Sequence, residues 1–291
     1  MITFTWDMGY YCNFKCEYCY FTKAGWMNIQ KMQGEPKSPD EMESAWENIC
    51  RSYGNAKIYI TGGEPFLYPG FVNILTRIIK YHVVHVTTNL SLPVDEFIRK
   101  IPADKVEVNS TYHPLYMSID EFVRQVIKLK SAGYRCGVCY LAYPAQLKEM
   151  INYKRYFKAQ GIDMALTAYW GDYKDKEYPR DYNSSEKKYY RFAEDWNSES
   201  DEGFAERFIK IDKTDNRNSV EPELSKGCTC YAGSRYATIS VNGIAKPCGQ
   251  INGPILGNLY DKTIKLLNGP YLCEAKFCKS KEYQYSNNTE K

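Results

Sequence analysis

The chain has 291 residues, and its 38 lysines and arginines nearly balance its 35 aspartates and glutamates, which gives a formal charge of +3. This balance excludes a nucleic-acid binder that works through bulk positive charge. With 44% hydrophobic residues the chain can build a large core, so widespread disorder is excluded. The sequence contains no apolar run of roughly 18 residues and no signal peptide. We therefore expect a cytoplasmic protein without a membrane or nucleic-acid partner.

Roughly the first 170 residues alternate strand and helix signals. The predicted strands are Ile2–Asp7, Ala56–Thr61, Val83–Thr88, Lys105–Val108, Arg135–Ala142 and Met164–Tyr169. The predicted helices are Asp40–Tyr53, capped by Asp40, then Phe71–Tyr81, Asp95–Ile101, Ser118–Ala132 with a Ser118–Glu121 capping box, and Pro144–Gln160. Repeated βα units imply a parallel sheet with right-handed crossovers. Six units are too few for a closed eight-stranded barrel, so the pattern predicts an α/β fold with an open, partial (β/α)6 barrel.

Residues 171–218 differ in composition from the units before them. They are rich in charged residues and tyrosine, and we interpret them as a solvated connector with one helix, Ser185–Trp196. The connector completes a first domain, 1–215, and residues 216–291 are expected to form a small domain rich in cysteine.

A β-hairpin is the clearest element of this second domain. Its strands are predicted at Tyr236–Val241 and Ile244–Cys248. The pair Asn242-Gly243 between them is a strong signal for a two-residue turn. A helix is predicted near Tyr260–Leu267.

Cysteine is unusually abundant, with 11 residues in a chain without a secretion signal, so disulfides are not expected. Most of the cysteines fall into two groups. The first group is Cys12, Cys16 and Cys19, and the second is Cys228, Cys230, Cys248, Cys273 and Cys278. Only three histidines are present, and none lies near either group in the sequence, which argues against mixed Cys/His zinc sites. The sequence therefore predicts two metal sites with sulfur ligands. His113, just past the fourth strand, could face the mouth of the barrel, but we interpret it as a surface histidine.

The first cysteine group lies on a short loop after the first strand, at the edge of a parallel sheet where ligands bind. Soft thiolates select zinc, copper(I) or iron–sulfur clusters. A structural zinc ion needs four ligands, and the sequence offers no fourth one nearby. Three cysteines on a cubic [4Fe–4S] cluster would leave one iron open to chelate a substrate or cosubstrate. A zinc loop is the alternative.

The spacing Cys12-x3-Cys16-x2-Cys19, with the aromatic Tyr18 before the last cysteine, resembles the radical S-adenosylmethionine superfamily. The resemblance implies that the open iron binds the amino and carboxylate groups of S-adenosylmethionine, with Tyr18 beside the adenine. It also implies that the reduced cluster cleaves this cosubstrate to methionine and a 5′-deoxyadenosyl radical. A flavodoxin- or ferredoxin-like reductant would supply the electron.

A second motif, Gly62-Gly63-Glu64-Pro65, ends the second strand and looks like the GGEP motif of the same superfamily. In that family its backbone and acid hold the methionine ammonium of the cosubstrate. The chemistry agrees, because glycine permits a close backbone approach and a carboxylate pairs with an ammonium group. The resemblance places further contacts to the ribose and carboxylate of the cosubstrate at Asn89, Asn109 and Ser110. The fifth strand ends in Leu141-Ala142-Tyr143-Pro144 instead of the glycine-rich adenine motif of some members.

The second cysteine group resembles the auxiliary-cluster domain of the SPASM and twitch subfamilies. The run C-x2-C-x5-C-x3-C of the full SPASM form is missing, so the twitch form with one auxiliary [4Fe–4S] cluster fits better. The resemblance implies the ligands Cys230, Cys248, Cys273 and Cys278, with Cys228 as a fifth candidate. A zinc knuckle with four thiolate ligands is the alternative.

The resemblance implies an enzyme with two [4Fe–4S] clusters that abstracts hydrogen from a substrate bound between the barrel and the second domain. The expected substrate is a ribosomal peptide or a protein side chain, which would be oxidised or cross-linked. The first strand starts at residue 2, so we expect no leader-binding domain before it, and this weakens the peptide case. A small-molecule dehydrogenase is the runner-up. A non-catalytic iron–sulfur electron carrier and a zinc-stabilised binding module are alternatives from other classes, but the electron carrier would not explain the GGEP motif.

Overall fold

The computed structural model describes residues 1–19, 21, 33–169, 171–184, 186, 226–249 and 253–275. Within these residues, nine strands form one sheet in the order β12-β11-β10-β1-β2-β3-β4-β5-β6. Its parallel part comprises β1 (Ile2–Gly9), β2 (Ala56–Gly62), β3 (Val83–Thr88), β4 (Val106–Tyr112), β5 (Cys136–Ala142) and β6 (Met164–Ala168). These six strands follow one another in space as they do in the chain, which confirms the predicted open barrel.

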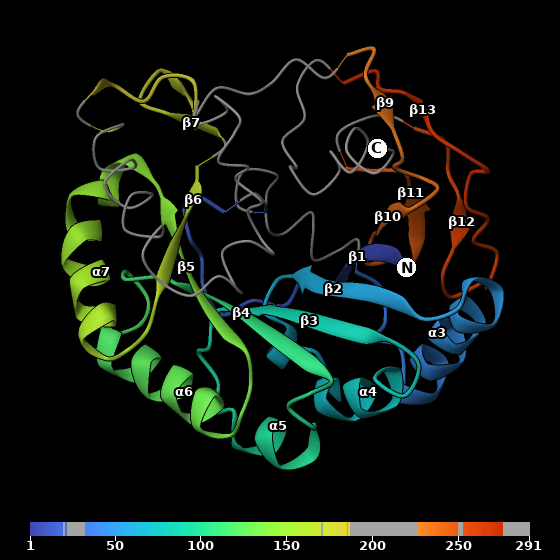
Figure 1. Ribbon diagram of the computed structural model, residues 1–291, viewed down its shortest axis with the longest axis horizontal. Helices are drawn as coiled ribbons and strands as arrows, with labels where there is room; N and C mark the ends of the chain where they lie inside the picture. Colours follow the sequence, from blue (N-terminus) through green and yellow to red (C-terminus); the bar gives the residue numbers. More distant parts are fainter. Residues whose placement is uncertain are drawn as a thin grey trace, which may run out of the picture.

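The helices lie in an arc outside the sheet, each between two successive strands (Figure 1). They are α3 (Pro39–Tyr53), α4 (Phe71–Ile78), α5 (Asp95–Lys100), α6 (Ile119–Ser131) and α7 (Met150–Ala159). Two 3-10 turns, η1 (Pro65–Leu67) and η2 (Pro144–Glu149), precede α4 and α7. The predicted helix Pro144–Gln160 therefore begins as a 3-10 turn.

Helix α3 is capped by Ser38, and the prediction that Asp40 caps it was wrong. The hydroxyl of Ser38 accepts a hydrogen bond from the Glu41 amide at 3.3 Å, and the Glu41 carboxylate accepts one from the Ser38 amide at 2.8 Å. This reciprocal pair is a capping box. Asp40 lies in the first turn of the helix, where a negative charge favours the helix dipole.

The main core lies between the sheet and the helices. Alternate residues of β1 point to this side, and Trp6 packs edge-on against Trp46 of α3 with ring centroids 5.2 Å apart. Buried His82 joins the layers, because its Nδ1 accepts a hydrogen bond from the Ala56 amide and its Nε2 lies 2.9 Å from the Trp46 carbonyl. The other face of each strand points into the barrel.

A β-hairpin formed by β10 (Tyr236–Ile239) and β11 (Ile244–Lys246) extends the barrel sheet. Strand β10 pairs in parallel with β1, from Thr3 opposite Tyr236 to Trp6 opposite Ile239. The short strand β12 (Gly257–Asn258) pairs with β11 and ends the sheet. The hairpin predicted from the sequence is present, but it continues the sheet of the barrel.

The hairpin turn differs from the two-residue turn that was predicted. The amide of Gly243 donates to the carbonyl of Ser240 at 2.8 Å, so Val241 and Asn242 occupy the centre of the turn. Gly243 follows with a φ of +83°, which is the arrangement of a three-residue loop with a glycine bulge. The glycine signal located the turn correctly but placed its centre one residue too far along.

The helix predicted near Tyr260–Leu267 is absent, and this segment is irregular. Lys262 has a φ of +59°, which a helix does not tolerate. Backbone amides of this segment donate to other segments of the same chain. The Lys265 amide donates to the Leu256 carbonyl at 2.7 Å, and the Leu267 amide donates to the Gly233 carbonyl at 2.8 Å.

Part of the predicted solvated connector is folded. Strands β7 (Gly171–Tyr173) and β8 (Lys176–Tyr178) form a hairpin whose two turn residues, Lys174 and Asp175, have φ values of +45° and +60°. Tyr178 and Tyr182 are buried, so this part packs on the barrel. The predicted helix Ser185–Trp196 lies almost wholly outside the described residues, as does the predicted boundary at residue 215. No helix in the described parts of the chain has the length and apolarity needed to cross a membrane.

Candidate active site

A cavity of about 340 Å³ opens at the carboxyl ends of the parallel strands. Every strand from β2 to β6 contributes to its wall, and the rest comes from the loop after β1 and from the residues that directly follow β2, β3 and β4. The lining residues are Cys12, Phe14, Cys16, Tyr18, Cys19, Thr61, Gly62, Gly63, Thr87, Thr88, Asn89, Asn109, Thr111, His113, Cys139, Leu141 and Thr167. This is the edge at which parallel α/β sheets bind ligands.

The three cysteines of the first group line this one cavity. Burial raises the pKa of the Cys16 thiol to about 12, so a metal must displace its proton on binding. Within the described residues, no three His, Cys, Asp or Glu side chains are close enough together to hold a single metal ion. A cubic cluster does not require such convergence, because each thiolate binds a separate iron. The donor set therefore fits an iron–sulfur cluster.

The two glycines of the GGEP motif allow β2 to approach the start of the cysteine loop. A Cβ atom on Gly63 would lie 2.1 Å from the Tyr11 carbonyl oxygen, and one on Gly62 would lie 2.3 Å from the Gly9 carbonyl oxygen. The amide of Gly63 donates to the Gly9 carbonyl at 2.7 Å. The glycines thus bring the chain's own backbone together, in addition to lining the cavity.

The carboxylate of Glu64 does not line the cavity. It is 2% exposed and accepts hydrogen bonds from the Thr88 hydroxyl at 2.8 Å, the Asn89 amide at 2.6 Å and the Phe66 amide at 3.1 Å. Burial raises the pKa of Glu64 to about 7 even though these hydrogen bonds favour its charged form. Glu64 therefore holds the end of β3 in place. Pro65 is buried and begins η1.

Asn89 connects this anchor to the cysteine loop. Its carboxamide nitrogen lies 4.0 Å from the Cys12 sulfur and donates to the Asn13 side-chain oxygen at 3.3 Å. The backbone amide of the same residue is held by Glu64. The sequence predicted Asn89 at this site, and the structure places it between the cavity and the loop.

Asn109 and Ser110 lie on opposite faces of β4, so the prediction that both face a ligand was wrong for Ser110. Strand β4 runs to Tyr112, four residues beyond the predicted end at Val108, and alternation separates neighbouring side chains. Asn109 lines the cavity and accepts a hydrogen bond from the Cys139 thiol at 3.1 Å. Ser110 is fully buried on the other face, where it donates to the Gly137 carbonyl at 2.8 Å.

His113 lines the cavity, so its interpretation as a surface histidine was wrong. Its Nδ1 lies 2.9 Å from the Tyr18 hydroxyl and 3.6 Å from the Cys16 sulfur, and its ring stacks on Tyr18 with centroids 5.8 Å apart. Burial lowers the pKa of His113 to about 4, which keeps the imidazole neutral at pH 7. The sequence held one signal for this position: His113 comes two residues after Thr111, so strand alternation places it on the inward face at the end of β4.

Asp7 is a second residue that the sequence did not single out. It lies on the inward face of β1, opposite Thr61 in the strand register. Burial raises the pKa of Asp7 to about 6. It is thus a carboxyl group inside the barrel that can change protonation state close to neutral pH.

The second cysteine group is brought together by a small two-stranded sheet of β9 (Thr229–Cys230) and β13 (Tyr271–Leu272). The amide of Cys273 donates to the Cys228 carbonyl at 2.9 Å. Burial raises the pKa of the Cys230 thiol, and the nearby thiols of Cys273 and Cys248 raise it further. Three of the four expected ligands are therefore neighbours.

The cysteines of this group differ in exposure, since Cys228 is exposed whereas Cys248 is buried. Cys278 lies outside the described residues.

The sequence profile of the Radical SAM superfamily matches residues 6–152, about half of the chain. The chain belongs to the radical SAM superfamily. Members of this superfamily use a [4Fe–4S] cluster and S-adenosylmethionine. The matched part contains the first cysteine group, the GGEP motif and strands β2 to β5, which together form most of the cavity.

Two curated proteins match parts of this radical SAM chain. A probable GTP 3′,8-cyclase of Thermoplasma volcanium is 33% identical over 102 residues, which are 34% of this chain and 29% of that protein. A putative glycyl-radical enzyme activating enzyme of Methanocaldococcus jannaschii is 28% identical over 147 residues, which are 50% of this chain and 51% of that protein. The chain thus spans about half or less of the length of these relatives.

Solved structures share the fold. The Streptococcus suis protein SuiB aligns with a TM-score of 0.59 and 16% identity, over 89% of this chain and 63% of SuiB. The protein anSMEcpe, solved with bound AdoMet, aligns with a TM-score of 0.65 and 16% identity, over 90% of this chain and 78% of anSMEcpe. The alignments cover nearly the whole radical SAM chain and so support the fold beyond the profile match.

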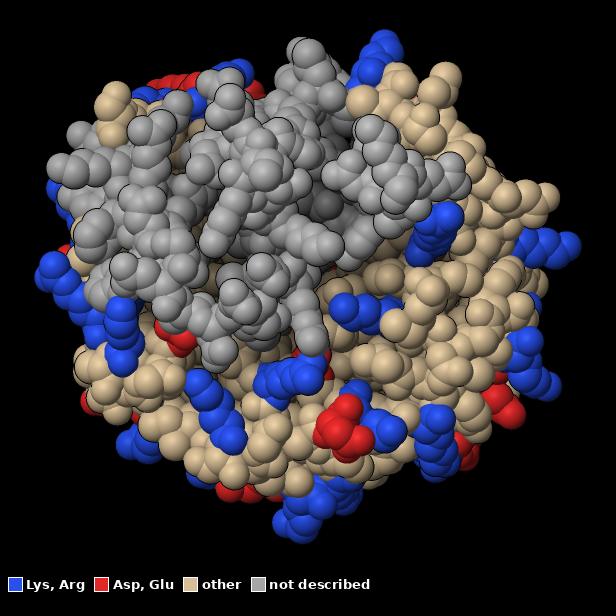
Figure 2. Space-filling model, viewed as in Figure 1, with Lys and Arg blue, Asp and Glu red and all other residues tan. Residues whose placement is uncertain are grey.

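Charged side chains are scattered around the described part of the face seen in Figure 2. Lysines and arginines are spread along its periphery, with acidic side chains between several of them. On the described part of this face, more lysine and arginine than aspartate and glutamate is visible.

Proposed function

We propose that the chain binds a [4Fe–4S] cluster through Cys12, Cys16 and Cys19 and uses it to cleave S-adenosylmethionine. The observation that carries this proposal is that these cysteines line one cavity together with Gly62, Gly63 and Asn89. When bound and reduced, the cluster supplies the electron that cleaves the cosubstrate, which yields a radical that abstracts hydrogen from a substrate. The cavity has the size and mixed polar and apolar lining of a small-molecule site.

The chain's own residues position the cosubstrate. Gly62 and Gly63 leave their backbone accessible at the cavity wall, and Asn89 and Asn109 present carboxamides to it. Tyr18 is held by His113, which fixes the ring that we expect beside the adenine. Glu64 acts as a positioning residue, because its carboxylate holds Asn89 and does not reach the cavity.

We further propose an auxiliary [4Fe–4S] cluster on Cys230, Cys248, Cys273 and Cys278, in a twitch-like region of residues 216–291. The proximity of the thiols of Cys230, Cys248 and Cys273 supports it. This cluster would accept an electron from the substrate or bind the substrate. Cys228, which is exposed, is a fifth candidate ligand that could replace one of these four.

The proposed substrate is a peptide or protein side chain, which is oxidised or cross-linked in the cytoplasm with electrons from a flavodoxin- or ferredoxin-like protein. One supporting observation is that anSMEcpe, which shares the fold, has been solved with AdoMet and a peptide. The second candidate is a small-molecule substrate, favoured by the partial match to a probable GTP 3′,8-cyclase.

The decisive experiment incubates the reduced, reconstituted chain with S-adenosylmethionine and a panel of Cys-, Ser- or Thr-containing peptides, with GTP in a parallel arm. Loss of two hydrogens from a peptide, or a new intramolecular bond, is expected together with 5′-deoxyadenosine. Conversion of GTP with no change in any peptide would favour the second candidate and contradict the first.

The auxiliary cluster is tested separately with Cys248→Ala, with Cys50→Ala as the control on the outer helix α3. Cys248→Ala should lower the iron content and abolish product formation, but it should still form 5′-deoxyadenosine. Its barrel must first be shown to unfold normally, because metal binding and folding are linked. A well-folded Cys248→Ala protein that forms product at the parent rate would contradict the redox role.

A further inference from the structure

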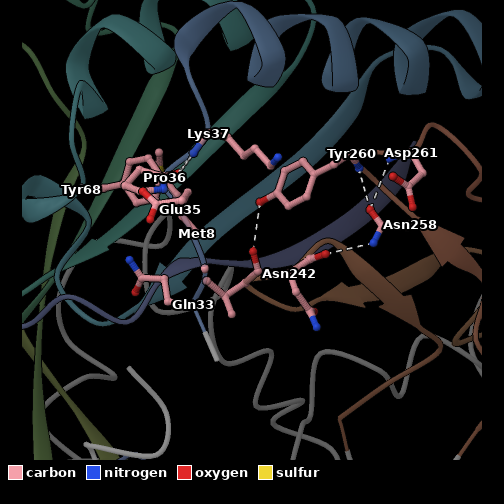
Figure 3. A pocket seen from close by; sticks show the side chains of 12 residues that line it. Met8, Gln33, Glu35, Pro36, Lys37, Tyr68, Asn242, Asn258, Tyr260 and Asp261 are labelled. Atoms are coloured by element: carbon pink, nitrogen blue, oxygen red, sulfur yellow. Dashed lines mark hydrogen bonds between the residues drawn. The ribbon is translucent and has the colours of Figure 1, made fainter. Parts of the chain in front are cut away.

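A second cavity, of about 290 Å³, lies beside the end of β1 and shares no lining residue with the candidate active site (Figure 3). One wall is the segment 33–37 that leads into α3, and the opposite wall includes Asn242 of the hairpin turn and Tyr260. Met8 and Tyr68 also line it. None of the functions described above uses this cavity.

Gln33 carries a buried hydrogen-bond donor at this cavity that has no partner in the described parts of the chain. The side chain is 8% exposed, and its Oε1 accepts a hydrogen bond from the Tyr10 amide at 2.6 Å. Because a backbone N–H can only donate, the oxygen of the carboxamide is occupied and the nitrogen is the free end. Among the residues that the structure describes, Gln33 Nε2 has no hydrogen-bond partner. Leaving a buried donor unpaired costs free energy, so a ligand with an acceptor oxygen would be bound favourably by this nitrogen.

Two opposite charges lie on the same segment as Gln33. Lys37 lines the cavity, and its ammonium group pairs with Glu41 at 3.3 Å, at a site where both side chains are substantially exposed. Such surface pairs contribute little, so Lys37 can turn from Glu41 to a carboxylate in the cavity. Glu35 is an exposed carboxylate at the rim of the cavity. Among the described residues, no hydrogen bond or ion pair involves the Glu35 carboxylate.

The remaining surface is apolar and aromatic. Met8 and Tyr68 are buried beneath the cavity, and Tyr260 lies beyond Lys37, whose Nζ is 5.6 Å from the centre of its ring. The Tyr68 hydroxyl accepts a hydrogen bond from the Lys37 amide at 2.7 Å, which ties the segment to the barrel. The charged groups are therefore held over a surface suited to an apolar or aromatic side chain.

We propose that this cavity binds a free α-amino acid with an apolar or aromatic side chain. Its carboxylate would accept hydrogen bonds from Gln33 Nε2 and Lys37, and its ammonium group would pair with Glu35. Its side chain would pack on Met8 and the tyrosine rings. Each ionic group of such a ligand thus meets a group of opposite charge, and the buried donor of Gln33 gains its acceptor.

The test is calorimetric titration of the full reconstituted chain with L-phenylalanine and L-methionine, without reductant. The Glu35→Gln and Lys37→Gln variants below distinguish binding in this cavity from binding in the candidate active site, whose lining contains neither residue. Both probes should bind. The N-acetyl derivative and the methyl ester of phenylalanine should bind at least about tenfold more weakly, because each lacks one of the two charges.

Two variants at accessible positions complete the test. Glu35→Gln and Lys37→Gln should each weaken binding by about tenfold, whereas Asp104→Asn and Lys105→Gln, which alter a surface pair elsewhere, should not. Thermal unfolding verifies that all four variants are folded. No binding at about 10 mM amino acid, equal binding of the blocked derivatives, or parent-like binding by Glu35→Gln and Lys37→Gln would each overturn the proposal. This result does not depend on whether the chain cleaves S-adenosylmethionine.

Discussion

The carboxylate of Glu64 accepts a hydrogen bond from the backbone amide of Asn89 at 2.6 Å, which joins the end of β2 to the end of β3. The side chain of Asn89 in turn reaches Asn13 on the cysteine loop. One buried acid therefore links the GGEP motif to the loop of Cys12 without contacting the cavity. This relationship supports our proposal that Glu64 positions Asn89 instead of contacting the cosubstrate directly.

Glu64→Gln should destabilise the folded chain by about 1–3 kcal/mol. The side-chain nitrogen of the new glutamine cannot accept a hydrogen bond, so at least one of the buried donors that now bond to the Glu64 carboxylate would lose its partner. The free energy of unfolding in urea measures this. Glu96→Gln, at an exposed helix position, should leave the stability close to that of the parent. Equal stability of Glu64→Gln and the parent would show that the three hydrogen bonds to Glu64 are dispensable.

Gly63→Ala should disrupt the contact between β2 and the cysteine loop, because its Cβ would lie 2.1 Å from the Tyr11 carbonyl oxygen. The backbone there must move, so we expect a lower melting temperature and weaker binding of S-adenosylmethionine. Gly54→Ala is a useful control, since a Cβ at Gly54 meets no atom within 4 Å. It carries only the strain of its own positive φ of +76°. Parent-like binding by Gly63→Ala would contradict the steric argument.

Asp7 predicts a particular pH dependence. Its pKa is 3.8 when unperturbed and about 6 in the folded chain. Between these values the unfolded chain has lost the proton and the folded chain still binds it, so the stability falls as the pH rises. The Asp7→Asn variant has no ionisable group at this position, so its stability does not show this decrease. Its stability relative to the parent should therefore rise by about 1–3 kcal/mol from pH 4 to pH 7.

Urea unfolding of the metal-free parent and the Asp7→Asn variant at both pH values measures this change, and contributions from other groups cancel in the comparison. A difference in stability that is the same at pH 4 and pH 7 would mean that Asp7 titrates normally.

Substitutions of Tyr18 and His113 should have coupled effects on stability. The two side chains are stacked, and the Tyr18 hydroxyl lies 2.9 Å from His113 Nδ1. His113→Phe keeps an aromatic ring but removes the nitrogen, and Tyr18→Phe removes the hydroxyl. A double-mutant cycle of unfolding free energies should give a coupling of about 0.5–1.5 kcal/mol. Additive effects of the two substitutions would contradict the hydrogen bond.

The sequence was sufficient to predict the parallel strands, because each has a buried apolar face and several, such as β2 and β3, are rich in β-branched residues. In β2, Ile58 and Ile60 face the helices, while Thr61, directly before the GGEP motif, faces the cavity. It was also sufficient to group the first three cysteines, because local spacing on one loop fixes their proximity. These features depend on neighbours in the chain.

Features that depend on distant neighbours were missed. The pairing of β10 with β1 joins residues more than 230 positions apart, such as Thr3 and Tyr236, and no local pattern encodes it. The hairpin at Lys174 and Asp175 lacks the Asn-Gly signal, although both residues adopt positive φ. His113 gained its role from burial against Tyr18, which only the assembled barrel provides.

The most direct test of the account is cleavage of S-adenosylmethionine by the reconstituted, reduced chain under anaerobic conditions, followed by chromatography of 5′-deoxyadenosine. The parent and the Cys50→Ala control should form 5′-deoxyadenosine. The variant with Cys12, Cys16 and Cys19 all changed to alanine should form none and should lose about half of the iron, because these thiolates are the proposed protein ligands of the first cluster. Formation of 5′-deoxyadenosine by the triple variant at the parent rate, with unchanged iron content, would contradict the central claim.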